Sequence, residues 1–198
     1  MLQEELLNRY GATKKTYSKG DMLFREDEQA RYYFQVIRGE VKMFNYNEEG
    51  KEFIQGIFTA DDSFGEPPLL NDKPYLTNAI ANEESELLML SKPNFMKLLN
   101  EDPAAGLAIC TRLADRLYYK SIMALEISSE HAEHRLLRFF DFLKFDVAKL
   151  PRNQKYHVDL TRQELADLTG LRVETVIRAV KALEKAKALS IEGRKIFR

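Results

Sequence analysis

The 198-residue sequence has no tryptophan and one cysteine, Cys110. A single cysteine excludes an internal disulfide. Cys110 lies within an apolar helical pattern, and a free thiol in that setting usually packs as a small buried hydrophobic group. We therefore expect Cys110 to be buried, and a redox switch is the less favoured interpretation.

Long apolar runs are also absent. No stretch approaches the roughly 20 residues that a membrane-spanning helix needs. The amino terminus, MLQEELLNRY, lacks the basic start and apolar stretch of a signal peptide. We expect a cytoplasmic protein without a membrane partner. With 44% hydrophobic residues, the chain can bury one or two cores, and two modest domains suit it better than one.

The motifs that most often carry catalysis are missing as well. There is no glycine-rich phosphate loop, no Ser or Cys nucleophile with a nearby His, and no distinctive pair of carboxylates. His131 and His134 lie three residues apart, His157 is isolated, and a metal or haem site would need further ligands. We predict that the protein is not an enzyme and has no catalytic residue, no metal site and no cofactor.

The chain has little net charge, but its charges are unevenly distributed. The formal charge is −1. Residues 131–198 hold 15 of the 30 Lys and Arg but only 9 of the 31 Asp and Glu, which leaves 15 against 22 for residues 1–130. An acidic part joined to a basic part is expected when one module must approach the phosphates of nucleic acid.

The amino-terminal part predicts β structure. Between Tyr17 and Leu90, short runs rich in Val, Ile, Phe and Tyr, such as residues 32–37 and 41–44, are separated by turn signals at residues 19–21, 38–40 and 47–50. This spacing is typical of a compact antiparallel β barrel or jelly roll.

After Pro93 the pattern becomes helical. Phe95, Leu98 and Leu99 predict one short amphipathic helix, and a long helix follows from about Pro103 to Ser128. Its apolar stripe recurs at steps of three and four residues, close to a heptad. This stripe could simply lie on the barrel, but we favour a two-fold dimer seam, because the segment that follows has the pattern of a helix-turn-helix, set out next, and proteins with that motif usually pair. The stripe comprises Leu107, Cys110, Leu113, Ala114, Leu117, Ser121, Ala124 and Ile127.

A helix-turn-helix is predicted from Thr161 to Leu183. Thr161 and Glu164 have the spacing of a capping box, and Gly170 can adopt the left-handed conformation that ends a helix. In the second helix, apolar residues at helical spacing face inward, and the remaining face is free to enter a DNA groove. The inward residues are Val176, Val180 and Leu183.

The outward face of this second helix carries groups that read bases. Arg178 fits the O6 and N7 acceptors of guanine, and Glu174 can accept from the amino group of cytosine. Ile177 and Val173 offer methyl groups to thymine. The alternative is an ordinary Glu174–Arg178 ion pair within the helix, worth only about 0.2–0.5 kcal/mol.

Further residues of this part are expected to bind the DNA backbone, which fixes register and not sequence. The predicted phosphate contacts are Arg162, Arg172, Lys181, Lys185, Arg194 and Lys195. The complete set of predicted DNA-binding residues around the helix-turn-helix is Thr161, Arg162, Gln163, Arg172, Val173, Glu174, Thr175, Ile177 and Arg178.

Five segments are more distinctive still: YSKGDMLFREDE, VIRGEVKMF, EEGKEFIQGIF, DDSFGE and LTRQELADLTGLRVETVIR. Together with the long helix, they resemble the Crp/Fnr superfamily of bacterial transcription regulators over nearly the whole chain. The resemblance implies an α+β fold with an antiparallel β jelly roll (residues 1–100), a dimerisation helix (101–128) and a winged helix-turn-helix (129–198), with a wing at 188–197. It also implies double-stranded DNA, a second copy of the chain and RNA polymerase as partners.

The resemblance sharpens the expected DNA target. Family members carry a Glu and, four positions later, an Arg that read the G·C pair of a TGA core, and these match Glu174 and Arg178. Cyclic-AMP receptor proteins have Arg where this chain has Val173, whereas Fnr-like members have Val. A half-site of TTGA type is therefore expected in preference to TGTGA.

The resemblance also exposes departures in the effector pocket. Relatives that bind cyclic nucleotides pair the phosphate with an Arg. At the matching positions this chain has Leu76 and Thr77. Burying a phosphate anion without a cation is costly. Pro67 and Pro68 remove two N–H groups nearby, and the Fnr cysteines that hold an iron–sulfur cluster are absent. We infer that cyclic AMP does not bind in the usual way. The residues of the pocket, if any ligand binds, are Phe64, Gly65, Glu66, Leu76, Thr77, Lys120 and Ser121.

Two alternatives to this function stay open from the sequence. One is a regulator that responds to a cyclic nucleotide through a non-standard pocket. The other is a ligand-binding signalling adaptor whose carboxy-terminal helices bind a protein partner. The identity or existence of a small-molecule effector is unknown at this point.

Overall fold

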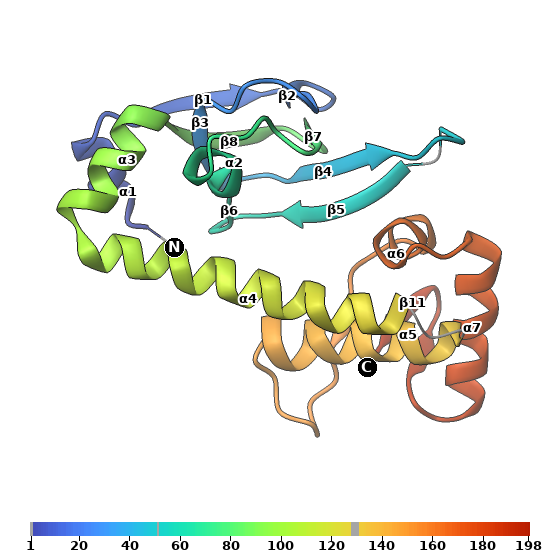
Figure 1. Cartoon of the computed structure of the whole chain (residues 1–198). Helices are drawn as coiled ribbons and strands as arrows, with labels where there is room; N and C mark the ends of the chain where they lie inside the picture. Colours follow the sequence, from blue (N-terminus) through green and yellow to red (C-terminus); the bar gives the residue numbers. More distant parts are fainter. Residues whose placement is uncertain (1, 51, 128–130) are drawn as a thin grey trace. The chain divides into compact units, whose positions relative to one another are not determined.

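The computed structural model describes residues 2–50, 52–127 and 131–198 (Figure 1). The chain divides into two compact units, Met1–Leu113 and Ala114–Arg198. Each has its own hydrophobic core. The amino-terminal β module and the carboxy-terminal helical module are therefore distinguished by two separate buried clusters.

The first unit is a sandwich of two four-stranded antiparallel sheets, which confirms the predicted jelly roll. Tight turns between strands are made possible by glycines in the left-handed region, as at Gly39 (φ 87°), where a Cβ would lie 2.6 Å from Ser85 Cα. One sheet has the order β1 (Thr13–Tyr17), β8 (Ser85–Ser91), β3 (Tyr32–Arg38), β6 (Ser63–Phe64). The other has the order β2 (Met22–Phe24), β7 (Asn78–Ala81), β4 (Val41–Tyr46), β5 (Glu52–Phe58).

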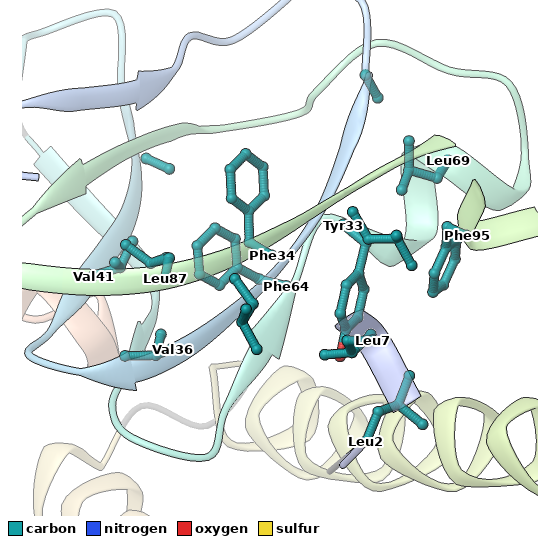
Figure 2. Close-up of a cluster of buried hydrophobic side chains, with 14 of the residues drawn as sticks. Leu2, Leu7, Tyr33, Phe34, Val36, Val41, Phe64, Leu69, Leu87 and Phe95 are labelled. Atoms are coloured by element: carbon teal, nitrogen blue, oxygen red, sulfur yellow. The ribbon is translucent and has the colours of Figure 1, made fainter. Parts of the chain in front are cut away.

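Aromatic rings fill the interior of this jelly roll. Phe34 stacks on Phe64 (Figure 2), with ring centroids 5.1 Å apart, and Phe24 stacks on Tyr75 with centroids 3.7 Å apart. Large buried rings contribute much of the apolar area that stabilises a domain of this size, and their stacking fixes their orientation.

Three short helices cover the jelly roll: α1 (Glu4–Arg9), α2 (Glu66–Leu70) and α3 (Lys92–Glu101). In α3, Phe95 and Leu98 are buried and Leu99 is partly buried, as the amphipathic pattern predicts. Phe95 stacks on Tyr33 of β3 with centroids 4.9 Å apart. This contact attaches the start of the helical region to the sheet.

The long helix α4 runs over Pro103–Ile127. One face packs on the core of the first unit through Ala105 and Ile109, with Leu113 partly buried beside them. The other face, which carries most of the predicted stripe, is exposed, so the prediction that Cys110 is buried was wrong. Apolar periodicity identified a stripe but could not tell what covers it. Ser128 and the side chain of Ile127 lie outside the described residues.

The second unit is a winged helix-turn-helix, as predicted. After α4, the elements are α5 (Ala132–Asp141), the π-helical segment η1 (Phe142–Val147), β9 (His157–Val158), α6 (Arg162–Thr169), α7 (Val173–Lys185), β10 (Ser190–Glu192) and β11 (Lys195–Phe197). The core packs α5 against α6 and α7, and includes Leu136, Leu165 and Val176. The three-stranded sheet has the order β10-β11-β9.

Arg198 attaches the wing to the helices. Its backbone N–H and carbonyl pair with Tyr156, its Nε donates to Asp141 Oδ1 of α5 at 2.6 Å, and its Nη1 donates to the carbonyl oxygen of Ala188 at 2.6 Å. Charged hydrogen bonds of this kind are stronger than neutral ones. These bonds attach the end of the wing to α5 and to the segments that precede β9 and β10.

Among the helices that the structure describes, none is long and apolar enough to cross a bilayer. The same described residues include no group of three or more metal-ligating side chains.

Candidate DNA-binding surface

The helix-turn-helix owes its geometry to local hydrogen bonds. Glu164 N donates to Thr161 Oγ1 at 3.1 Å and Thr161 N donates to Glu164 Oε2 at 2.7 Å, so the predicted capping box is present. Gly170 ends α6 in the left-handed region (φ 69°), and Leu171 N donates back to the carbonyl oxygen of Ala166 at 3.0 Å. The two helices are therefore joined at a fixed angle.

Burial orients the second helix, α7. Val176, Val180 and Leu183 are buried, as predicted, and Ala179 is buried with them. This inner face packs on the core of the second unit. The rotation of α7 is fixed by that packing, and the opposite face is presented outward.

The outward face carries Glu174, Ile177 and Arg178, all exposed. Ile177 is 39% exposed, which is high for a large aliphatic side chain. Val173 differs from the expectation of a fully outward position, because it is partly buried and packs at the edge of the core. It presents fewer methyl atoms than Ile177.

Glu174 and Arg178 do not form the helix ion pair that was the alternative interpretation. Arg178 Nη2 donates to Thr175 Oγ1 at 3.5 Å, and within the described residues no ion pair joins it to Glu174. A bond of 3.5 Å is weak. Both charged groups are therefore available to another molecule.

Gln163 is held by a residue that the sequence reasoning did not single out. Asp167 is buried, and both of its carboxylate oxygens accept from Gln163 Nε2 at 2.9 Å. A carboxylate only accepts, so the amide nitrogen must face it. Their spacing of four residues on one helix was the available signal. The amide of Gln163 is consequently fixed at the exposed start of α6.

A groove of about 710 Å³ lies between α7, the start of α6 and the wing. Its lining includes four of the predicted phosphate contacts. Burial lowers the pKa of Arg162 from its ordinary value, but a guanidinium remains charged at neutral pH. Gly193 turns the wing with φ 65°. The cations of the groove are Arg162, Lys181, Arg194 and Lys195.

Two other predicted phosphate contacts lie outside this groove. Arg172 is the exposed N-cap residue of α7, and Lys185 is exposed in its last turn. They mark the two ends of a helix of 13 residues, about 20 Å long. One group of predicted phosphate contacts therefore lies beside the wing, and one cation lies at each end of α7.

In the first unit, three residues predicted for an effector pocket instead pack in the core or form hydrogen bonds and turns of the fold itself. Phe64 is buried in the aromatic stack, and Gly65 (φ 90°) begins α2 where a Cβ would lie 2.8 Å from Tyr32 O. Glu66 is fully buried and accepts from Ser63 Oγ at 2.6 Å.

Leu76 and Thr77, which follow α2 in the chain, differ in exposure. The side chain of Leu76 is 75% exposed, whereas Thr77 is buried. The carbonyl oxygen of Leu76 accepts from Asn45 Nδ2 at 2.7 Å. Leu76 offers no positive charge to an anion.

Lys120 and Ser121 belong to the second unit. Both are exposed, and Ser121 Oγ donates to the carbonyl oxygen of Leu117 at 2.8 Å. Partial desolvation, and then the nearby charge of Arg116, lower the pKa of Lys120 from its ordinary value. The hydroxyl of Ser121 is engaged by its own helix.

Known families and proteins match both units. A cyclic nucleotide-binding domain model matches residues 14–102, and a Crp-like helix-turn-helix domain model matches residues 134–198. The chain is 27% identical over 187 residues to the fumarate and nitrate reduction regulatory protein of Yersinia pestis, covering 92% of this chain and 73% of that protein. It is 26% identical to the cAMP-activated global transcriptional regulator CRP of Pasteurella multocida, covering 91% of this chain and 87% of that protein.

Solved structures share the fold. A CooA mutant from Carboxydothermus hydrogenoformans matches with a TM-score of 0.81 and 23% identity, over 100% of this chain and 86% of that one. FixK2 from Bradyrhizobium japonicum matches with a TM-score of 0.75 and 23% identity, over 93% and 91%.

The relatives that match along both units are transcription regulators and not enzymes. In this chain the two matched domains are a cyclic nucleotide-binding-type jelly roll and a Crp-like helix-turn-helix, whose second helix carries Glu174 and Arg178 on its exposed face. The chain is a DNA-binding transcription regulator and belongs to the Crp/Fnr superfamily.

Proposed function

We propose that the protein acts as a homodimer that reads an inverted repeat with TGA-containing half-sites, of TTGA type. The observation that carries the proposal is the pair Glu174 and Arg178, one turn apart, exposed on a helix whose opposite face is locked into a core. Neither group is used in an ion pair with the other within the described part of the chain. Such a pair suits the donor and acceptor pattern of a G·C pair in the major groove.

The remaining predicted contacts position the protein on the duplex. Arg162 and the wing cations line one groove, so a phosphate strand passing along it would meet several positive charges. Gln163, held by Asp167, keeps one amide N–H for a phosphate oxygen, because the carboxylate takes up the other.

Selection of binding sites from random duplex DNA tests the proposed half-site. We expect inverted repeats whose half-sites contain G·C at a fixed position and whose centres lie about 34–36 Å apart, one helical turn. Selected sites without a fixed G·C pair would contradict the assignment of Glu174 and Arg178.

The homodimer is supported by the exposed stripe of α4. Leu107 is 69% exposed and Leu117 is 68% exposed, although both are large aliphatic residues. With Cys110, Ala114, Ser121 and Ala124 they recur every three or four residues along one exposed helix face, as at the a and d positions of a heptad. A face of this kind is stabilised by pairing with a copy of itself, and residues 101–128 would form the dimerisation helix.

Cys110 offers a direct test of the pairing. In a parallel two-stranded arrangement, residues at one d position face each other, close enough for a disulfide. Oxidation with copper phenanthroline is expected to yield a covalent dimer, and Cys110→Ser is expected to yield none. A wild-type chain that stays monomeric in both the oxidation and a sedimentation experiment would contradict the dimer.

We further propose that cyclic AMP does not act through the usual phosphate contact. Leu76 points away from the interior and carries no charge, and Glu66 is already bonded within the fold. Calorimetric titration is expected to show no micromolar affinity for cyclic AMP. Saturable micromolar binding would instead support a regulator with a non-standard cyclic-nucleotide pocket.

Salt dependence separates a DNA reader from an adaptor that binds a protein partner. DNA affinity should fall with ionic strength with a logarithmic slope of about −0.9 for each phosphate neutralised. A largely apolar protein contact would show little dependence. RNA polymerase is the further partner expected once the dimer sits on DNA.

A further inference from the structure

A cavity of about 370 Å³ in the first unit is separate from the residues predicted for an effector pocket. None of Phe64, Gly65, Glu66, Leu76 or Thr77 lines it. Its walls include four aromatic side chains and its rim includes two opposite charges. The volume lies in the range of small-molecule sites, which are typically apolar with a few placed polar groups.

The aromatic walls are preformed. Phe24 and Tyr75 stack with centroids 3.7 Å apart and an interplanar angle of 10°, and Phe34, labelled in Figure 2, lies 5.7 Å from Phe24. The hydroxyl of Tyr75 accepts from Arg31 N at 3.3 Å and Tyr32 N at 3.4 Å. These bonds hold the ring, so a planar ligand would meet a fixed surface.

The fourth ring, Tyr32, lines the cavity at the protein surface. Its side chain is 38% exposed, and its centroid lies 6.2 Å from that of Phe34 at an angle of 59°. An exposed aromatic ring beside buried ones can cover a bound ring without being needed for the core.

The rim carries one exposed acid and one exposed base, Glu28 and Arg31. Glu28 Oε2 accepts from Arg25 N at 3.2 Å, which fixes the turn that presents its carboxylate. Within the described residues, the guanidinium of Arg31 is in no ion pair. A ligand with a single charge would satisfy one of these groups and place a like charge or an apolar atom against the other.

We propose that this cavity binds a free aromatic amino acid. The ring lies against the exposed Tyr32, with the buried Phe24 and Tyr75 as the floor beneath it. The α-carboxylate pairs with Arg31, and the α-ammonium pairs with Glu28. Guanidinium–carboxylate pairing is among the stronger polar contacts available to a small ligand. The proposal concerns binding by the first unit alone and does not rest on the DNA contacts of the second.

Calorimetric titration of the full chain with L-phenylalanine tests the proposal. Phenylacetate, which lacks the ammonium, and phenethylamine, which lacks the carboxylate, are the matched probes. Phenylalanine is expected to bind saturably at millimolar or lower concentration, and each single-charge probe at least about tenfold more weakly, as the loss of a charged hydrogen bond implies.

Variants identify the site. Arg31→Gln and Glu28→Gln should each weaken phenylalanine binding by about tenfold, and the glutamine at 28 can still accept from Arg25 N. Tyr32→Ala should weaken it as well. Arg25→Gln is the control, since Arg25 is exposed in the same turn but does not line the cavity. Far-UV circular dichroism and thermal melting check that each variant is folded.

Three results would overturn the proposal: no saturable binding of phenylalanine at millimolar concentration, equal binding of the single-charge probes, or folded Arg31 and Glu28 variants that bind as the wild type does. Because no DNA is present in the titration, any of these results leaves the proposed DNA reading intact. Failure of the site selection would likewise leave the titration unaffected.

Discussion

Helix α7 and the segment around α2 are the two regions where the family resemblance makes the most specific demands, and they meet them differently. On α7, Glu174 and Arg178 are present, exposed and not paired with each other in the described structure. Around α2, the position where the resemblance expects a phosphate-binding cation carries the exposed Leu76, and Glu66 is bonded inside the fold. The difference shows that the residues expected to read DNA lie exposed on α7, whereas the position expected to hold the phosphate-binding cation carries an uncharged side chain.

The largest expected effect comes from the helix that would join two copies of the reading surface. Leu117→Lys places a charge in the middle of the exposed stripe, and the two recognition helices would then bind half-sites separately. DNA affinity should fall by about 10²–10⁴, the advantage that linked binding provides. Gel-shift titration and sedimentation measure both effects.

Asp115→Lys is the matched control for that substitution, since Asp115 is exposed two residues away and is not part of the stripe. It should leave the dimer intact. If Leu117→Lys still sediments as a dimer and binds normally, α4 does not form the seam.

The next effect concerns base reading. Arg178→Ala should cost about 1–3 kcal/mol on the preferred site and relax preference at one base pair. Lys181→Ala, on the same helix but at the wing groove, should weaken all sequences alike. Competition binding with single-base variants of the site distinguishes the two. An Arg178 variant that keeps its sequence preference would argue against the assignment.

A smaller effect is expected from the wing. Arg194 is exposed at the tip and lines the groove beside α7. Arg194→Ala should reduce the salt slope of DNA binding by about 0.9, the value for one phosphate contact. Arg152→Ala, an exposed cation that does not line this groove, should leave the slope unchanged. Equal slopes for wild type and Arg194→Ala would remove the wing from the interface.

The smallest effect is on stability. Thr161→Ala removes the side-chain half of the capping box and should destabilise the second unit by about 1 kcal/mol. Thr111→Ala is the control, because Thr111 lies within α4 and its hydroxyl donates to the carbonyl oxygen of Leu107. Denaturant unfolding measures both. If Thr111→Ala lowers the free energy of unfolding as much as Thr161→Ala does, the capping box does not stabilise the protein more than an ordinary helix hydrogen bond.

The features that sequence predicted best are those set by near neighbours. The capping box and the Gly170 turn depend on residues within one or two helical turns, and the pattern of Val176, Val180 and Leu183 follows helical periodicity. The jelly roll was recognisable because its strands are short and separated by turn residues.

The features that sequence missed depend on distant packing. Cys110 shares the apolar period of α4, but periodicity does not reveal that Ala105 and Ile109 take the buried face. Two local features were also missed: the π-helical segment Phe142–Val147, which has no distinctive motif, and the Gln163–Asp167 contact, for which a spacing of four residues was the only signal. The aromatic cavity joins the neighbouring strands β2 and β3 to Tyr75, which lies 43 residues after Tyr32.

The most direct test of the central claim is a double-mutant cycle between Arg178 and the fixed G·C pair of the selected half-site. Affinities are measured for wild type and Arg178→Ala on the site with G·C and on the site with A·T. We predict a coupling energy of about 1–3 kcal/mol between the side chain and the base pair. A coupling energy of zero, with additive losses, would contradict the claim that Arg178 reads this base pair.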